Sequence, residues 1–503
     1  MSHKNIVLCA DGTGNKGGYT PDSNVFKIYN YVDLHVRDLE QISYYDNGVG
    51  TSTNQLFKAL SGGIGLGFQT NVCELYEFLA RQYEPLDQVY LFGFSRGAAT
   101  IRAFTGFIGA CGLIDGRNMS AIELKKQVSR AFEVYKDQTK LDGWKDTLAN
   151  HGKIPIRMVG VWDTVSALGG PQRTDITGPL SFLIDKVSNL LDWIIEVLWP
   201  HRFYDYDLTK NIENAYQALA IDDERTSFWP LLWTEPEAGS KQVVEQTWFS
   251  GMHSNIGGGY AREGMANVTL EWMLVRAANL GLVFRPGVLK EARYKSNAKG
   301  LMYDSRAGFA RFYRYHPRDI SSLCKDTVTG SVRIHDSVIS RLERQIDNYT
   351  PKQMPNEFAV VGTELDSDDK GKIEYHMNPG SMPGWKELRK TANRNINRRK
   401  RVYSVFLVAM LVIVGMAIKF WIHPPQPSGR SGFSGHIADF LNYILPKMFD
   451  GLIEFSVVQR PFYFLGFLVI AAVFLVFRKT MVLNRIQTAA SALRDIILKT
   501  AKS

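Results

Sequence analysis

The sequence predicts an α/β fold, a mainly parallel β-sheet with helices on both faces, followed by a C-terminal two-helix transmembrane hairpin. Three observations support this prediction. Short apolar runs alternate with amphipathic stretches over residues 4–360. Several of these runs end in polar residues, as expected where loops at the carboxyl ends of parallel strands form a site. Two uncharged segments near the C-terminus each approach the roughly 20 apolar residues needed to cross a bilayer.

The expected strands are short runs rich in β-branched and aromatic residues. They are KNIVLCA (4–10), QISYYD (41–46), QVYLFGF (88–94), IPIRMVGVW (154–162) and VVEQTWFSG (243–251). Amphipathic stretches such as residues 70–83 and 121–138 separate several of them and predict helices. Strands that alternate with helices form a mainly parallel sheet. We therefore expect one large domain over residues 1–360.

Charge and cysteine usage argue against several classes of protein. The net charge is +9, but residues 386–401 alone hold eight Lys or Arg against one Glu. Because the excess lies in this short stretch, we expect no nucleic-acid partner. The four cysteines have neither the paired spacing of a zinc site nor that of a disulfide framework (Cys9, Cys73, Cys111 and Cys324). We expect no metal and no cofactor.

Residues 402–503 predict a membrane module, with spans at 402–422 and 461–477. Residues 402–418 and 461–477 are each 17 uncharged residues long, so a soluble core helix is the alternative for each. Basic residues flank the pair on its outer sides, whereas the intervening loop holds few. The positive-inside rule then places both termini and the N-terminal domain in the cytoplasm, at the inner membrane.

The polar linker, residues 361–401, ends in the basic stretch, which we call the basic collar (386–401). Anionic lipid headgroups are its expected partners. After the second span, residues 484–500 have the pattern of an amphipathic cytoplasmic helix. That helix favours self-association, and a regulatory protein is the other partner we expect.

Ser95 is the candidate nucleophile. Residues 93–97 read Gly-Phe-Ser-Arg-Gly and fit G-x-S-x-G, a pattern that occurs often by chance. Here an apolar strand precedes it and a helical stretch follows, which is the strand–turn–helix context that exposes a reactive serine in an α/β-hydrolase-like fold. The alternative is a serine that begins a helix.

The order Ser, Asp/Glu, His places the acid and the base after Ser95. His253 is the candidate base because it follows an expected strand and precedes three glycines. Asp163 ends the strand run after Ser95 and is the candidate acid, with a helix cap as the alternative role. Asp222 and Asp223 also lie between Ser95 and His253, so they remain competing acids.

The oxyanion hole should use backbone N–H groups beside the nucleophile. We expect one from Arg96 and the other from the loop after the first strand, at Gly12 or Thr13. Asp11 would brace that loop rather than react.

Several motifs occur together in one order: CADGTGN (9–15), GFSRGA (93–98), VGVWDTV (159–165) and WFSGMHSNIGGGY (248–260). In this the chain resembles the serine α/β-hydrolase domain of the first class of type VI secretion phospholipase effectors, which is also widespread in uncharacterised bacterial and fungal proteins. The resemblance covers roughly residues 4–360. It implies a triad of Ser95, Asp163 and His253 and carboxylic-ester hydrolysis. Asn255 departs from it, since this site is often aspartate.

Residues 178–201 form an apolar helical run between the acid and the base. They are either an ordinary core helix or a lid that faces the membrane and admits an acyl chain. We therefore expect a membrane-anchored, phospholipase A-like serine hydrolase that acts on membrane phospholipid, with a toxic or defensive role implied by resemblance alone. The alternatives are an anchored esterase for a soluble or non-phospholipid substrate, and a non-catalytic membrane scaffold.

Overall fold

The computed structural model describes residues 3–12, 15, 17–19, 21–48, 63–144, 151–165, 204, 206–237, 239–307, 315–429, 432–445, 447–477 and 482–501. Two compact units account for them. The first comprises the described residues up to Lys386 together with 493–501, and the second runs from Glu387 to Ala492. Thr13 and the candidate lid at 178–201 lie outside the described residues.

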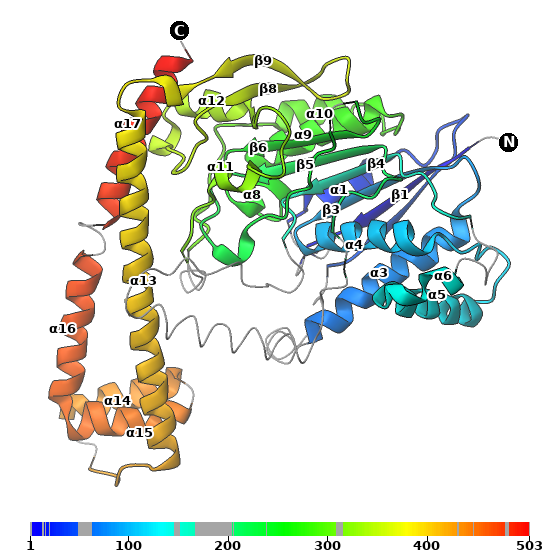
Figure 1. Cartoon of the computed structure of the whole chain (residues 1–503). Helices are drawn as coiled ribbons and strands as arrows, with labels where there is room; N and C mark the ends of the chain where they lie inside the picture. The colour runs from blue at the N-terminus through cyan, green and yellow to red at the C-terminus, as the bar shows by residue number, and fades with distance from the viewer. Residues whose placement is uncertain are drawn as a thin grey trace. The chain divides into compact units, whose positions relative to one another are not determined.

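A nine-stranded sheet forms the centre of the first unit (Figure 1). The order is β2-β1-β3-β4-β5-β6-β7-β8-β9, and all neighbours are parallel except β8 and β9. The strands are β1 (Asn5–Ala10), β2 (Gln41–Asp46), β3 (Gln88–Phe94), β4 (Met158–Trp162), β5 (Asn214–Ala220), β6 (Val243–Phe249), β7 (Arg333–His335), β8 (Phe358–Leu365) and β9 (Gly371–Met377). The mainly parallel α/β fold is confirmed.

All five expected strands are present, as β1, β2, β3, β4 and β6. The other four strands were not anticipated. β5 is fully buried and rich in alanine, so it has no alternating pattern, and β7 has three residues. β8 and β9 carry the sheet past residue 360 and into the segment expected to be a linker.

Helices cover both faces of the sheet because alternate residues of each strand point to opposite sides. Ile6, Leu8 and Ala10 of β1 pack into one core, and Val7 and Cys9 into the other. The first core is completed by α3 (Gly63–Gln82), α4 (Arg96–Cys111) and α5 (Ala121–Lys136), and the second by α1 (Asn24–Tyr31), α9 (Gly264–Asn279) and α10 (Val288–Lys295). The expected helices at 70–83 and 121–138 are α3 and α5.

β1 lies between β2 and β3, so the chain passes from β1 to β2 on one side and then crosses β1 to reach β3 on the other side. In open α/β sheets such a switch point, at the carboxyl ends of the strands, is where ligands bind. The residues after β1, β3, β4, β5 and β6 all meet at this edge. It therefore gathers every candidate catalytic residue that the structure describes.

The second unit is helical, and the first turn of α13 precedes it. Its elements are α13 (Trp385–Ile422), α14 (Gly432–Ile444), α15 (Asp450–Ile453), a π-helix (Glu454–Gln459), α16 (Pro461–Phe477) and the start of α17 (Asn484–Thr500). In Figure 1, α14 and α15 lie across one end of α13 and α16. The expected spans fall on the second half of α13 and on α16, so both segments are helical as expected.

The expected transmembrane hairpin itself is not supported by the helix lengths. Among the described residues, no single helix combines the length and apolar composition needed to cross a bilayer. Two consecutive helical segments, residues 447–459 and 461–476, meet the length and composition requirements together. They are bent by 101° at their junction.

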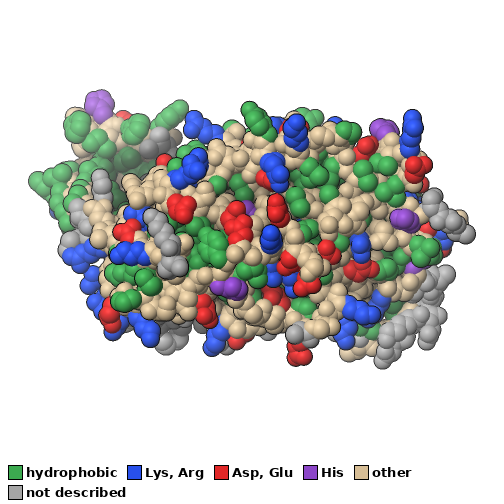
Figure 2. All heavy atoms as spheres, turned by 90° about the horizontal axis from the view of Figure 1, so that it is seen from above, with side chains coloured by type: hydrophobic (Ala, Val, Ile, Leu, Met, Phe, Trp, Pro, Cys, Tyr) green, Lys and Arg blue, Asp and Glu red, His purple; other side chains and the backbone are tan. Residues whose placement is uncertain are grey.

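Charge is mixed on the face of the molecule that Figure 2 shows. Figure 2 shows Lys and Arg interspersed with Asp and Glu on the face seen from above. Among the side chains coloured there, no basic stripe of the kind that follows a nucleic-acid backbone is seen.

Candidate active site

Ser95 lies on a sharp turn between β3 and α4. Its backbone has φ 59° and ψ −120°, a region that non-glycine residues rarely adopt. A Cβ on Gly93 would lie 2.7 Å from the Cα of Ala98, and one on Gly97 would overlap the carbonyl of Ala10. Both glycines are therefore needed for close approach of strand and helix. Such a turn holds a serine hydroxyl above the sheet, and its strain is typical of catalytic sites.

Asp163 and His253 meet at the same edge of the sheet. Asp163 follows β4, and His253 begins the short helix α8 (His253–Gly257) after β6. The imidazole Nδ1 lies 2.6 Å from Oδ2 of Asp163, and both side chains are buried. An ionised carboxylate only accepts, so Nδ1 carries the proton and donates it. This tautomer leaves Nε2 as the basic nitrogen.

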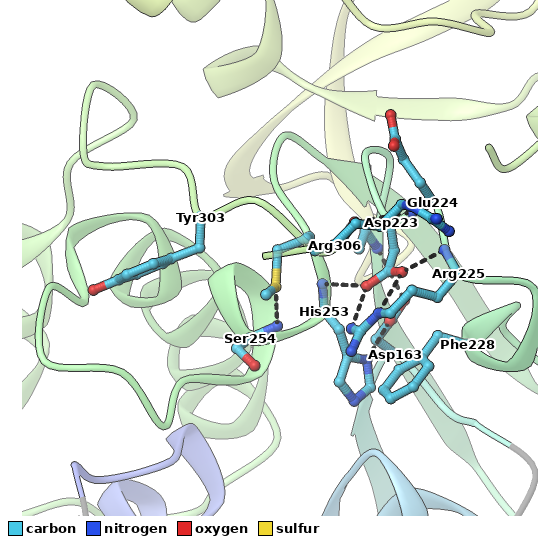
Figure 3. Close-up of polar contacts among 12 residues, drawn as sticks. Asp163, Asp223, Glu224, Arg225, Phe228, His253, Ser254, Tyr303 and Arg306 are labelled. Carbon is cyan, nitrogen blue, oxygen red and sulfur yellow. Dashed lines mark hydrogen bonds and ion pairs between the residues drawn. The ribbon is translucent and has the colours of Figure 1, made fainter. Parts of the chain in front are cut away.

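The ring of His253 is held between two aromatic side chains. Phe94, which directly precedes Ser95, lies 4.7 Å from it between ring centroids. Phe228 meets it edge-on at 5.1 Å between centroids (Figure 3). Its Nε2 is buried and has no hydrogen-bond partner among the residues that the structure describes. The structure thus pairs Asp163 with His253 and places the ring against the residue before Ser95, without a hydrogen bond from the Ser95 hydroxyl to Nε2.

The two competing acids make other contacts. Asp223 accepts hydrogen bonds from Arg225 and, at 3.3 Å, from the backbone N–H of His253 (Figure 3). Asp222 accepts from the backbone N–H of Gly251 at 2.7 Å. Both carboxylates hold the loop that carries the histidine, and only Asp163 contacts its ring nitrogen.

Gly12, expected in the oxyanion hole, bonds to Asp11 instead. Gly12 is close to the nucleophile, since a Cβ on it would lie 3.2 Å from that of Ser95. However, the N–H of Gly12 donates to Oδ1 of Asp11 at 2.6 Å, so it does not point to an oxyanion. Thr13 lies outside the described residues, and Arg96 is the first residue of α4 and directly follows Ser95.

Asp11 directly follows β1, and its buried carboxylate accepts several hydrogen bonds. Besides Gly12, its carboxylate accepts from the side chains of Asn15 at 2.9 Å, Tyr45 at 2.7 Å and Ser23. Because this carboxylate is saturated with donors, it fixes the loop beside Ser95, in the bracing position expected for it.

Arg318 makes a two-pronged ion pair with Asp163. Its Nη1 and Nη2 lie 2.6 Å from Oδ1 and 2.8 Å from Oδ2, and the N–H of Ala220 donates to Oδ1 at 3.0 Å. Arg318 also donates to the carbonyls of Ala220 and Phe228. Its side chain is fully buried. The acid is thus fixed from two sides, by His253 and by a guanidinium.

These contacts set the charge states of the pair. Burial by itself would raise the pKa of Asp163, but the positive charge of Arg318 and the hydrogen bond from His253 hold it below its ordinary value. Burial lowers the pKa of His253, and its contact with Asp163 offsets this only in part. The site therefore holds an ionised acid and a neutral histidine near pH 7.

Among the described residues, no group of three or more His, Cys, Asp or Glu side chains is placed to hold a metal ion. The contacts described above suit acyl transfer through a serine, with the histidine as the proton carrier.

The family comparison matches residues 4–276, more than half of the chain, to the family described as "T6SS, Phospholipase effector Tle1-like, catalytic domain". The chain belongs to this family. The suspected resemblance is therefore confirmed, and membership of the Tle1-like family supports a hydrolase of the lipase type. The matched region contains β1 to β6 and every candidate catalytic residue.

The chain is also similar to two uncharacterized proteins, at lower sequence identity. The chain is 23% identical to the uncharacterized protein YEL023C of Saccharomyces cerevisiae, over 62% of each chain. It thus spans less than two thirds of that relative's length. A crystal structure of an uncharacterized protein from Pseudomonas aeruginosa is similar at 15% identity and a TM-score of 0.33, over 92% of this chain and 66% of the other.

Sequence reasoning missed two parts of this Tle1-like site. Arg318 lies 155 residues after Asp163, in no motif, and a buried arginine has no sequence signal of its own. The bond from the Gly12 N–H to Asp11 was also missed, although an Asp-Gly turn with an Asn four residues later is a pattern in which side chains often bond nearby backbone.

Proposed function

We propose that this protein is a membrane-anchored serine hydrolase that cleaves carboxylic esters of membrane phospholipids in a phospholipase A-like reaction. The observation that carries the proposal is the pairing of Asp163 with His253 beside the strained turn of Ser95. Nε2 of His253, which has no hydrogen-bond partner in the described part of the chain, is the atom that would take the serine proton. Membership of the Tle1-like family supports a lipid substrate.

In the proposed reaction, Ser95 Oγ attacks the ester carbonyl carbon while its proton moves to Nε2 of His253. The carbon–oxygen bond to the lysophospholipid then breaks, and His253 returns that proton to the leaving alkoxide. Water attacks the acyl-enzyme by the same route, which releases the fatty acid and restores Ser95. Asp163 holds the imidazole in the tautomer that both steps need. The oxyanion would accept from the Arg96 N–H and from the loop after β1.

The proposed anchor is α16 together with the second half of α13. α16 is apolar along its whole length and exposed over most of its surface, as Phe462, Ile470 and Val473 illustrate. A helix that is apolar all round lies inside a protein core or a membrane. Since α16 is not in a core, lipid is the surrounding that suits it. We propose a hairpin with both termini and the catalytic unit in the cytoplasm, at the inner membrane, with anionic headgroups at the basic collar.

The test uses purified full-length protein with vesicles of phosphatidylethanolamine and phosphatidylglycerol, and identifies released fatty acid and lysolipid by mass spectrometry. The Ser95→Ala variant is the control. We expect wild type to release fatty acid and the variant to release none. Release that is equal in both would contradict the proposal.

Two outcomes would favour the alternatives. Turnover of short soluble esters, with intact vesicles left uncleaved, would favour an esterase that is anchored only for location. Failure of wild type to react with any ester or serine-directed probe would favour a non-catalytic scaffold. A toxic or defensive role rests on the family and is tested by expression in bacterial cells, where wild type but not Ser95→Ala should permeabilise the membrane.

A further inference from the structure

We infer that Arg318 is a positioning residue of the catalytic site, which holds the carboxylate of Asp163 against His253 and sets the pH below which His253 no longer acts as a base. The inference rests on the function proposed above. It assigns a role to a residue that belongs to none of the motifs and lies outside residues 4–276.

The geometry shows what Arg318 holds. Its two terminal nitrogens lie 2.6 and 2.8 Å from the two oxygens of Asp163, which fixes the carboxylate plane. The same nitrogens donate to the carbonyls of Ala220, at the end of β5, and of Phe228. Phe228 in turn packs edge-on against the ring of His253. The Arg318 side chain therefore holds both the carboxylate of Asp163 and the backbone of Phe228, whose ring contacts His253.

The segment that carries Arg318 is itself tied to the site. Tyr315 forms a β-bridge with Arg225, and the N–H of His316 donates to the carbonyl of Glu224 at 2.8 Å. Asp319 then caps the short helix α11 (Ile320–Cys324). These contacts place Arg318 behind the acid with its side chain directed inward, as a planar fork suited to a carboxylate.

The charge of Arg318 has a chemical consequence. In the transition state His253 becomes an imidazolium beside Asp163, and that carboxylate is already paired with a guanidinium. The ion pair of Asp163 with Arg318 carries less net negative charge than a lone carboxylate, so it stabilises the positive charge of the imidazolium less. Arg318 therefore makes His253 a weaker base but keeps it unprotonated to lower pH.

The other charged groups near His253 do not neutralise the carboxylate of Asp163 as Arg318 does. Asp223 accepts from the backbone N–H of His253, and its own charge is paired with Arg225. Arg225 also stacks on Phe228, with its guanidinium carbon 3.4 Å from the ring centroid. Among the described charged groups at this site, Arg318 is the one that binds the triad carboxylate directly.

The test measures kcat/KM for a short soluble ester against pH, per active site titrated with a fluorophosphonate, in full-length wild type, Arg318→Gln and Arg318→Lys. For Arg318→Gln we expect the midpoint of the acid limb to rise by about one pH unit, because the charge of Asp163 is no longer compensated. For Arg318→Lys the charge remains, so the limb should move less, while kcat falls about tenfold because an ammonium cannot hold both oxygens.

The matched control is Arg276→Gln. Arg276 forms an equally buried two-pronged pair with Glu245, with both distances 2.8 Å, away from the triad. Its loss should lower Tm and leave the acid limb in place.

Three outcomes would overturn the inference. The first is Ser95-dependent turnover whose acid limb coincides in wild type and Arg318→Gln, which leaves the proposed function standing. The second outcome applies if Arg318→Gln does not fold. It is an Arg318→Lys enzyme whose kcat per titrated site equals that of wild type. No Ser95-dependent turnover in wild type would remove the proposed function and the inference together.

Discussion

At the scale of single residues, three carboxylates close to His253 differ in what they contact. Asp163 binds its ring nitrogen, whereas Asp223 binds its backbone N–H. In Asp163→Asn we expect kcat/KM to fall about 10³–10⁴-fold, because Arg318 draws the amide oxygen and the NH₂ group is left facing Nδ1. In Asp223→Asn the loss should stay below about tenfold, since only the loop is affected. Equal losses in the two variants would contradict this assignment.

The pH dependence follows from the burial of His253. Burial lowers its pKa below the ordinary 6.5, so the imidazole is neutral at pH 7 and becomes protonated only as the pH falls through that lowered value. We expect the acid limb of kcat/KM to have its midpoint below pH 6.5. Measurement from pH 4.5 to 8 with a soluble ester checks this, and a midpoint above 7 would contradict it.

A second group titrates in the same range and needs its own control. Burial raises the pKa of Asp222, which supports the histidine loop, to about 6. Asp222→Asn should leave the midpoint in place if His253 is the titrating base.

The sequence was sufficient to predict Ser95, Asp163 and His253 as candidates, because each follows a strand and parallel strands end at one edge. It left three acids open, since the choice depends on which side chain reaches Nδ1. It did not reveal Arg318, whose role comes from a loop that packs against the site. Nor did it reveal that the Gly12 N–H is committed to Asp11, which depends on the loop conformation.

At the scale of elements, the turn between β3 and α4 depends on close backbone approach. Gly97→Ala would place a methyl group into the carbonyl of Ala10. We expect it to lower the free energy of unfolding by about 2–4 kcal/mol and to displace Ser95, with a large loss of kcat. Urea unfolding and kcat are the measurements.

Gly109→Ala is the matched control on the same helix. Its methyl group would meet the side chains of Thr209, at 2.9 Å, and of Asn211, at 3.7 Å, and the nearest atoms include no backbone atom. It should cost little stability and leave kcat near wild type. A Gly97→Ala enzyme as active and stable as Gly109→Ala would disprove the steric account of the turn.

Elements with a clear pattern were predictable, and the others show why some were not. β1 and β3 are apolar runs that end at polar or glycine residues, and α5 is amphipathic with Ser120 as its N-cap. β5 has no alternation because both of its faces are buried. β9 is mostly polar and pairs only with β8, so its sequence resembles a linker.

At the scale of the whole molecule, the chain divides into the unit that holds the candidate catalytic residues and a helical unit that contains the apolar helix α16. Leu468→Arg combined with Ile470→Arg should weaken membrane association, because each arginine at the centre of a span costs about 2.5–3.5 kcal/mol. Both side chains are exposed on α16. Flotation of full-length protein with vesicles measures the bound fraction.

The control pair for this prediction is Ile122→Arg with Tyr294→Arg. These two apolar side chains are highly exposed in the first unit, where no membrane contact is proposed. This variant should float like wild type. Unchanged flotation of the α16 variant would remove α16 from the proposed anchor.

The central claim is that Ser95 is the nucleophile and His253 its base. The most direct measurement is mass spectrometry of full-length protein treated with a fluorophosphonate, which maps the modified residue and its rate of formation. We expect one adduct, on Ser95, that is absent in Ser95→Ala and forms at least about 10²-fold more slowly in His253→Ala. An adduct on another residue, or labelling of Ser95 at an unchanged rate without His253, would contradict it.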